Sequence, residues 1–304
     1  LAKKMNNWLK NSQLENDSIA IVDWRLIKFL QSELDKKQIP WILMDRSPPA
    51  DTGLFAFLQW PVWKNAWKRV SKSKSANGCI VSKEHQNLIQ SRINISSSKF
   101  TIIPAGVDLE LFCPGKKNEI LTMVYHGRLD KHRGILALPM FAHKAKQAGV
   151  KLRLILIGEG DVFPQLQNLS ESYDYIQVES NMKQENIASI LAEAHLGLLP
   201  MPDTKLWSIA SPLKRSEYAA AGMMIFGIDH SGHRFPNMQS CEWMKLVPQY
   251  DFHTDGVEWL KSLNQDLIED YSKKARVYAE DELSWNKSVD RLEQIIISQS
   301  NILS

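Results

Sequence analysis

Short apolar runs alternate with amphipathic helical stretches along the whole chain, and this alternation constrains the fold more than any other feature. The runs that predict strands lie at 19–24, 40–45, 78–82, 100–104, 121–127, 152–158, 175–178, 196–200, 223–228 and 245–248. Helical periodicity falls mainly at 25–37, 54–75, 84–92, 134–148, 184–194, 212–221, 255–268, 266–282 and 285–300. Strands that are apolar on both faces and separated by helices are typical of parallel sheets with helices on each side. The sequence therefore predicts an α/β fold.

The segment AGVDLELFCPGKKN, at 105–118, is rich in turn-forming residues and predicts a linker. It divides the chain into a first domain over 1–106 and a second over 107–284. A βαβ unit takes about 30 residues, so the first domain has room for only three to four strands. We therefore expect this N-terminal domain to be incomplete.

Charge and cysteine content narrow the functional classes. Lys and Arg number 37 against 34 Asp and Glu, a net charge of +3 that does not indicate nucleic-acid binding. The 3 cysteines are far apart in the sequence, which favours a reduced, cytoplasmic environment. The longest apolar stretch, at 53–63, is interrupted by Gln59 and Pro61 and is too short to span a bilayer.

The segment HGRLDKHRG, at 126–134, places arginines on both sides of a strand-to-helix loop. Gly127 and Arg128 leave the strand, and Arg133 enters the following helix. Arginine makes bidentate contacts to phosphate, so the pair can grip a diphosphate from two sides. The alternative is a solvated loop with ordinary surface charges.

The segment SPLKRSEYAAAG, at 211–222, has the pattern of a helix start. Ser211 is suited to the N-cap and Pro212 to the first helical position. The free amides of Leu213 and Lys214 would then form an anion site, and Glu217 can accept both hydroxyls of a ribose. The alternative is a capped helix whose glutamate is merely exposed.

Two further strand ends are weaker signals. In LILIGEGD, at 154–161, Gly158 and Gly160 allow a close backbone approach to a ligand, but the dinucleotide fingerprint is incomplete. In GIDHSGH, at 227–233, two loop histidines are expected to be solvated. No Asp-x-Asp occurs, so we expect neither a metal nor any other cofactor.

In this order, and together with FTIIPAGVDLELFCP at 100–114, these motifs resemble the signature series of the glycosyl transferases group 1 family. The resemblance covers about 100–296 and extends only loosely to 1–99, through VSKEHQNLI at 81–89. It implies the GT-B fold, in which two Rossmann-like domains with parallel sheets face each other. The segment LSWNKSVDRLEQII, at 283–296, resembles the family's closing helix, so 285–304 is assigned to the first domain.

The resemblance also implies an activity and a set of roles. The activity is transfer of a sugar from a nucleoside-diphosphate donor to a sugar or lipid-linked acceptor, with retention of configuration and without a metal, as in glycan biosynthesis. Arg128 matches the diphosphate-binding arginine, and Arg133 stands where a lysine is usual; these two are the catalytic candidates. The donor-binding candidates are Gly127, Gly158, Ser211, Pro212, Leu213, Lys214 and Glu217, and the nucleobase region is represented by Asn181 and Met182.

The sequence departs from the family in two places. Ile209 stands where a second glutamate is common, eight positions before Glu217. The usual post-strand histidine of the N-terminal domain is not evident, and DRSPPADTG at 45–53 offers Asp45 and Arg46 as acceptor-side candidates instead. The alternatives to a glycosyltransferase are a non-catalytic nucleotide-sugar-binding module and another GT-B enzyme, such as an epimerase.

The stretch 54–75 is both aromatic and basic. The helical spacing of Trp60, Trp63 and Trp67 places them on one face, beside Lys64, Lys68 and Arg69. An aromatic face beside a basic one is how a helix lies in an anionic membrane interface. The prediction is peripheral docking at the inner face of the membrane, and the alternative is that the tryptophans belong to the core.

Overall fold

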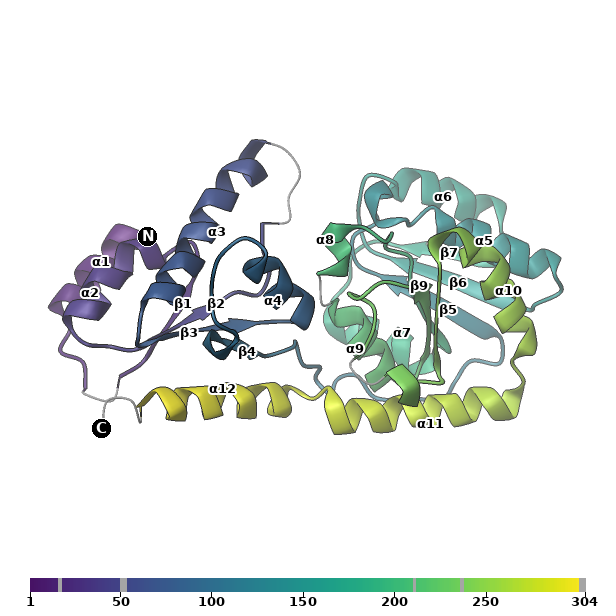
Figure 1. Cartoon of the computed structure of the whole chain (residues 1–304). Coiled ribbons are helices and arrows are strands. Elements are labelled where there is room, and N and C mark those ends of the chain that lie inside the picture. The colour runs from purple at the N-terminus through teal and green to yellow at the C-terminus, as the bar shows by residue number, and fades with distance from the viewer. Residues whose placement is uncertain (16–17, 50–53, 210–211, 236–237, 301–304) are drawn as a thin grey trace. The chain divides into compact units, whose positions relative to one another are not determined.

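The computed structural model describes residues 1–15, 18–49, 54–209, 212–235 and 238–300. The chain divides into two compact units. The first contains Leu1–Ala105 and the chain from Ser288 onward, and the second contains Gly106–Ser208 and Pro212–Lys287. Each unit is a parallel β-sheet with helices packed against it (Figure 1).

The described strands of the first unit form a parallel sheet in the order β1-β2-β3-β4. These strands are β1 (Ala20–Asp23), β2 (Trp41–Met44), β3 (Ala76–Ile80) and β4 (Phe100–Ile102). The helices are α1 (Ala2–Asn11), α2 (Ile27–Lys36), α3 (Leu54–Lys72), α4 (Lys83–Gln90) and α12 (Trp285–Ser300). All of these elements except α1 are predicted by the sequence.

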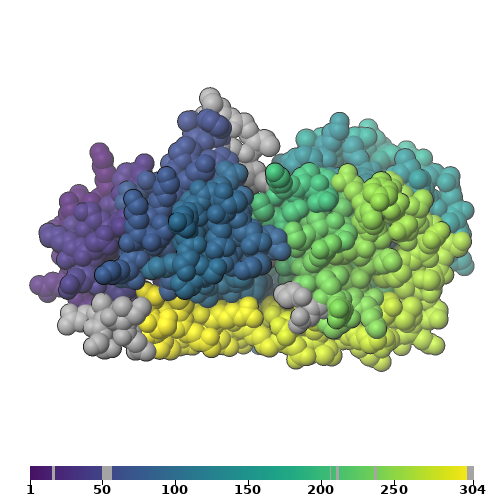
Figure 2. All heavy atoms as spheres, viewed as in Figure 1, coloured from purple at the N-terminus to yellow at the C-terminus, as the bar shows by residue number. Residues whose placement is uncertain are grey.

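The central strands of the first sheet carry buried side chains on both faces, as their apolar sequences require, whereas Ile21 of the edge strand β1 is exposed. Trp41 and Leu43 pack into the larger core, which α2 and α3 also supply. Ile42 points the other way and packs with Ile295 of α12. Figures 1 and 2 show α12, coloured yellow, running along this unit. The predicted return of the last helix to the N-terminal domain is confirmed.

The described strands of the second unit form a parallel sheet in the order β10-β9-β8-β5-β6-β7. These strands are β5 (Leu121–His126), β6 (Leu152–Ile157), β7 (Ile176–Glu179), β8 (Leu196–Leu199), β9 (Met224–Ile228) and β10 (Met244–Val247). The helices are α5 (Ala137–Gln147), α6 (Phe163–Ser172), α7 (Gln184–Glu193), α8 (Lys205–Ser208), α9 (Leu213–Ala220), α10 (Phe252–Ser262) and α11 (Gln265–Glu282). Because the strands are parallel, the loops after β5, β6, β8 and β9 lie at one edge of the sheet.

The break between α10 and α11 is sharper than the two overlapping predicted helices. Asn264 is the N-cap of α11, and its side chain accepts a hydrogen bond from the backbone N–H of Leu267 at 2.8 Å. Such a cap fixes a helix start because it satisfies an amide that has no partner within the helix. The helix over 255–268 therefore ends earlier than predicted, at Ser262.

Candidate functional site

The candidate site lies where β5 ends in the second unit. His126 is the last residue of β5, and Gly127 and Arg128 follow it. Gly127 has a φ of 118°, in the left-handed region that favours glycine. A Cβ atom at this position would lie 3.0 Å from the Nζ of Lys214, which belongs to α9. The backbone after β5 therefore lies against the end of the Lys214 side chain.

The two arginines that were predicted to bind a diphosphate converge on one carboxylate, that of Asp130. Arg128 donates to it from Nη2 at 2.9 Å and from Nε at 3.1 Å. The Nε of Arg133 lies 3.6 Å from the same carboxylate. The hydrogen bonds from Arg128 hold the pKa of Asp130 below its ordinary value. The sequence analysis missed Asp130, although its position between the two arginines is a usable signal.

Helix α9 begins at Leu213, one residue later than predicted. Pro212 is the N-cap, with φ −67° and ψ 125°, and does not occupy the first helical position. Ser211, the predicted N-cap, lies outside the described residues. The first turn, including the amides of Leu213 and Lys214, still has N–H groups without partners inside the helix. The predicted anion site at this helix start therefore begins one residue further along the chain.

Lys214 brings a third cation to the loop after β5. Its Nζ lies 5.2 Å from the centroid of the Tyr125 ring. Burial, reinforced by Arg133, lowers the pKa of Lys214 to about 8, against the opposing effect of Glu217. This ammonium group is therefore the cation at the site whose charge changes within the ordinary assay range.

Glu217 is not merely exposed, as the alternative interpretation of its motif had it. Its Oε2 lies 3.1 Å from the Nε2 of His126, and both side chains are largely buried. Burial lowers the pKa of His126 although Glu217 opposes the shift. One carboxylate oxygen thus faces the imidazole at the end of β5. The His126 contact is a second feature that the sequence analysis missed.

The glycines of LILIGEGD bring two loops together. A Cβ at Gly158 would lie 1.9 Å from the carbonyl oxygen of Gly127, and φ at Gly158 is 142°. A Cβ at Gly160 would lie 2.2 Å from the carbonyl group of Leu129. The loop after β6 can therefore press against the loop after β5 only because both positions lack a side chain. Direct contact between Gly158 and a donor stays a prediction.

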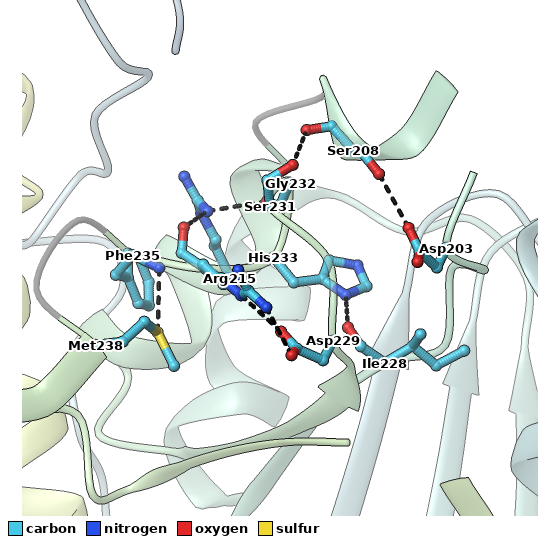
Figure 3. Close-up of polar contacts among 11 residues, drawn as sticks. Asp203, Ser208, Arg215, Ile228, Asp229, Ser231, Gly232, His233, Phe235 and Met238 are labelled. Carbon is cyan, nitrogen blue, oxygen red and sulfur yellow. Dashed lines mark hydrogen bonds and ion pairs between the residues drawn. The ribbon is translucent and has the colours of Figure 1, made fainter. Parts of the chain in front are cut away.

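The loop after β9 is tied to α9 and to the residues after β8 (Figure 3). Arg215, on α9, donates from Nη1 to the carbonyl oxygen of Gly232 at 2.9 Å and also to that of Arg234. The Nδ1 of His233 lies 2.6 Å from the carbonyl oxygen of Ile228. The contacts of Arg215 hold the start of α9 in place through its third residue.

The two histidines of this loop are not solvated, so that expectation is wrong. His230 is 4% exposed and His233 is fully buried. Their rings are in contact, with centroids 3.8 Å apart and planes tilted by 37°, and the Nε2 of His230 lies 3.2 Å from the carbonyl oxygen of Met201. Burial lowers the pKa of both imidazoles. The pair belongs to the packing of the loop after β9.

The predicted nucleobase region follows β7, at the same sheet edge. Asn181 is exposed, and Met182 is half-buried and packs on the core of the second unit. Met182 therefore provides an apolar side chain within the loop after β7. Contact of these two residues with a base stays a prediction.

In the first unit, Asp45 is fully buried, and its carboxylate is hydrogen-bonded by two tryptophans. Its Oδ2 accepts hydrogen bonds from the indole N–H of Trp63 at 2.6 Å and of Trp67 at 2.8 Å. The Nε2 of His85 lies 3.2 Å from the same oxygen. Asp45 therefore cannot contact an acceptor, and that prediction is wrong. Arg46 is exposed and donates from Nη1 to the carbonyl oxygen of Ile103 at 3.3 Å.

The predicted aromatic face of α3 is mostly core. Trp63 and Trp67 are fully buried, because their indoles bond Asp45, so neither can contact a membrane. Trp60 is half-buried, and the helix runs through Pro61 instead of beginning there. The side chains of Lys64 and Arg69 are half-covered, whereas Lys68 is exposed.

A cationic groove remains on the surface of the first unit. It has a volume of about 610 Å³ and is lined by Phe57, Trp60, Pro61, Lys64, Asn65, Lys68 and Arg92. The guanidinium carbon of Arg92 lies 4.2 Å from the centroid of the Trp60 ring, and Phe57 is 73% exposed. Within the described parts of the chain, Lys64, Lys68 and Arg92 form no ion pair. The groove therefore combines apolar surface with three unneutralised cations.

The described residues contain neither a candidate metal site nor a candidate membrane span. No cluster of three or more His, Cys, Asp or Glu side chains among them could hold a metal ion. No helix among them combines the length and the apolar character that crossing a membrane requires.

Comparisons with known proteins establish the fold class. No model of a known protein family matches the sequence, and no curated protein matches it. Solved structures of GT-B glycosyltransferases do match. The two Rossmann-like units with parallel sheets are thus the GT-B fold that the sequence predicts.

Three of these structures illustrate the match. S. aureus TarM, in complex with fondaparinux, α-GlcNAc-glycerol and UDP, has a TM-score of 0.73 and 12% identity, covering 97% of this chain and 58% of TarM. The pneumococcal O-GlcNAc transferase GtfA, with UDP and GlcNAc, has a TM-score of 0.69 and 13% identity, covering 97% and 59%. Anabaena HepE, with UDP, has a TM-score of 0.70 and 12% identity, covering 99% and 82%. The chain thus spans less than two thirds of TarM and GtfA.

Proposed function

We propose that the chain is a retaining glycosyltransferase, or the larger part of one, that transfers a sugar from a nucleoside-diphosphate donor to a sugar or lipid-linked acceptor. One observation carries the proposal. The Lys214 side chain, from the first turn of α9, lies against Gly127. Arg128 and Arg133 approach Asp130 in the same loop. Lys214 interacts with Glu217 of α9. Three cations and a helix N-terminus therefore lie at the ligand-binding edge of a parallel sheet.

The cations match the diphosphate of the donor. Arginine forks bind phosphate oxygens bidentately, and the first-turn amides of α9 add partial positive charge. Arg128 and Arg133 are the catalytic candidates because they meet the charge that builds up on the leaving diphosphate. Stabilising that charge is the main chemical demand of the transfer.

Glu217 matches the ribose. Its Oε2 lies 3.1 Å from the Nε2 of His126. A carboxylate can accept hydrogen bonds from two vicinal hydroxyls. Asn181 and Met182, after β7, are proposed to pack against the base.

Retention and metal independence are part of the proposal. Arg128, Arg133 and Lys214 supply the positive charge at the leaving group, so the reaction needs no divalent ion. In the resembled family, a phosphate oxygen of the donor is proposed to take the acceptor proton on the same face of the sugar. The chain then needs no general base of its own.

Calorimetric titration with UDP, ADP and GDP, followed by a donor-hydrolysis and transfer assay, tests the proposal. We expect binding of at least one nucleoside diphosphate and turnover that persists in a chelator. Binding without turnover would instead indicate a non-catalytic module, to which Ile209 in the usual glutamate position also points. Conversion of the donor sugar without transfer would indicate another GT-B enzyme, such as an epimerase.

We also propose that the protein works in the cytoplasm, at the inner face of the membrane. The groove that Phe57, Trp60, Lys64, Lys68 and Arg92 line supports this, because apolar side chains and unneutralised cations together suit an anionic lipid surface. Co-sedimentation with anionic vesicles tests it. Binding that weakens with salt supports docking, and absence of binding at low salt removes it.

A further inference from the structure

Among the described residues, Asp130 is the carboxylate that both candidate catalytic arginines approach. Its oxygens accept two hydrogen bonds from Arg128, at 2.9 and 3.1 Å, and lie 3.6 Å from Arg133. The guanidinium N–H groups that contact Asp130 are the donors that a bound diphosphate would need. A carboxylate and a phosphate make the same bidentate contact to a guanidinium group, so they compete for it.

The carboxylate is fixed and Arg128 is the freer partner. The Asp130 side chain is only 10% exposed, whereas that of Arg128 is 61% exposed. The backbone N–H of Asp161 also donates to Oδ1 of Asp130, at 3.4 Å. A Cβ at position 160 would lie 2.7 Å from this oxygen, so the loop after β6 presses on the carboxylate from behind. When the ion pair opens, it is therefore Arg128 that moves away.

Arg133 is only partly satisfied by Asp130. Its Nε is buried and has no hydrogen-bond partner in the described part of the chain. Its guanidinium carbon lies 4.8 Å from the centroid of the Trp207 ring, which holds the group in place. Asp130 is thus shared by two guanidinium groups, and it is the carboxylate that hydrogen-bonds Arg128.

We propose that Asp130 is a positioning residue that stands in for the diphosphate: it neutralises Arg128 in the empty site, and the donor must displace it. This inference rests on the proposed function. Asp130 holds Arg128 beside the site and lowers the affinity for the diphosphate at the same time. It therefore favours release of the nucleoside diphosphate, because the carboxylate recaptures Arg128 as the product leaves.

The test is Asp130→Asn, with binding of UDP, UMP and uridine measured by calorimetry. Asparagine keeps the shape and the acceptor for the Asp161 N–H but removes the competing charge. We expect UDP to bind about fivefold more tightly, in line with the ~1 kcal/mol of a partly exposed ion pair. UMP should gain less, and uridine should not change. If Asp130 had only a structural role, the gain in affinity would not increase with the number of phosphates in the ligand.

Glu159→Gln is the matched control. Glu159 is an exposed carboxylate that interacts electrostatically with Arg128 but makes no hydrogen bond to it. Its removal should change UDP affinity less than twofold. An equal gain in both variants would show a general charge effect and overturn the inference. Weaker or unchanged UDP binding by Asp130→Asn would also overturn it.

Two further outcomes are separable. Should Asp130→Asn fold poorly, Asp130→Ser removes the same charge with a smaller side chain, and the same ordering is expected. Should the unmodified protein bind none of UDP, ADP and GDP, the proposed function itself fails and this inference fails with it. If the unmodified protein binds a nucleoside diphosphate but the variants do not gain affinity in the order UDP, UMP, uridine, only the role of Asp130 is rejected.

Discussion

Polar side chains follow the strands of both sheets, but their burial and their contacts differ between the two units. In the first unit, Asp45 is sealed by two indoles and an imidazole. In the second unit, Arg128 is 61% exposed, and Glu217 is largely buried, where it faces the imidazole of His126. The helices make the difference, because α3 brings tryptophans onto its strand end, whereas α9 brings a lysine and free amides. The same kind of residue at a strand end is thus structural in one unit and available for binding in the other.

The largest expected effect is on stability. Asp45→Ala leaves two buried indole N–H groups without an acceptor, at a cost of about 1–3 kcal/mol each. We expect a loss of about 3–5 kcal/mol in the free energy of unfolding, measured by denaturant titration. Asp23→Ala is the control, because Asp23 ends β1 and pairs with the exposed Arg25, a pair worth at most about 1 kcal/mol. Equal losses would show that the seal around Asp45 is unimportant.

The sealing of Asp45 also marks the limit of sequence analysis. The parallel strands and the alternating helices are predictable because apolar periodicity runs along the chain, whereas the return of α12 is expected from the family resemblance of 283–296. Trp63 and Trp67 are spaced as a helical face, but spacing cannot say whether that face meets lipid or a buried carboxylate. Only the fold brings Asp45, which is distant from them in sequence, to their indole N–H groups.

The candidate site divides in the same way. Arg128, Lys214 and Glu217 could be predicted because each lies at a strand end or helix start. For Asp130 the sequence holds a usable signal, its position between the two arginines, whereas the contact of His126 with Glu217 depends on how the fold places two side chains that are distant in sequence. Pro212 was misplaced by one residue because helix starts are the least regular part of a helix.

The next effect is on nucleotide affinity. Arg128→Ala removes charge-assisted hydrogen bonds, each worth about 1.5–3 kcal/mol, so we expect the Kd for a nucleoside diphosphate to rise roughly ten- to a hundredfold. Calorimetry measures it, with Arg153→Ala, an exposed arginine of β6, as control. An unchanged Kd for Arg128→Ala would refute the assignment of the diphosphate site.

Glu217 allows a test of ribose recognition. Glu217→Gln should weaken binding of a ribonucleotide about tenfold, or about 1.4 kcal/mol, because an amide is a poorer acceptor for two hydroxyls than a carboxylate. The 2′,3′-dideoxy form should lose little, since it has no hydroxyls to donate. Equal losses for both ligands would mean that Glu217 only supports His126 and the helix.

Lys214 predicts a pH dependence of binding. The protonated ammonium favours the diphosphate, and burial lowers its pKa to about 8 in the empty site. As pH rises through this value the charge is lost, so affinity should fall up to about tenfold between pH 7 and 9. Lys214→Arg, which stays charged, should remove the dependence. A flat profile for the unmodified protein would show that Lys214 does not meet the phosphate.

The smallest effect concerns the first unit and returns to α3, whose inner face seals Asp45 and whose outer face lines the cationic groove. Lys64→Gln removes one groove cation, and a cation near an anionic membrane surface contributes about 1 kcal/mol. We expect about a fivefold weaker association with vesicles that contain phosphatidylglycerol, measured by co-sedimentation at low salt. Lys72→Gln is the matched control, because Lys72 lies at the end of the same helix and lines a different hollow. If both variants bind equally, α3 supplies only general positive charge, and the groove is not the docking surface. If only Lys64→Gln is impaired, one helix serves two functions, structural on its buried face and membrane-binding on its outer face.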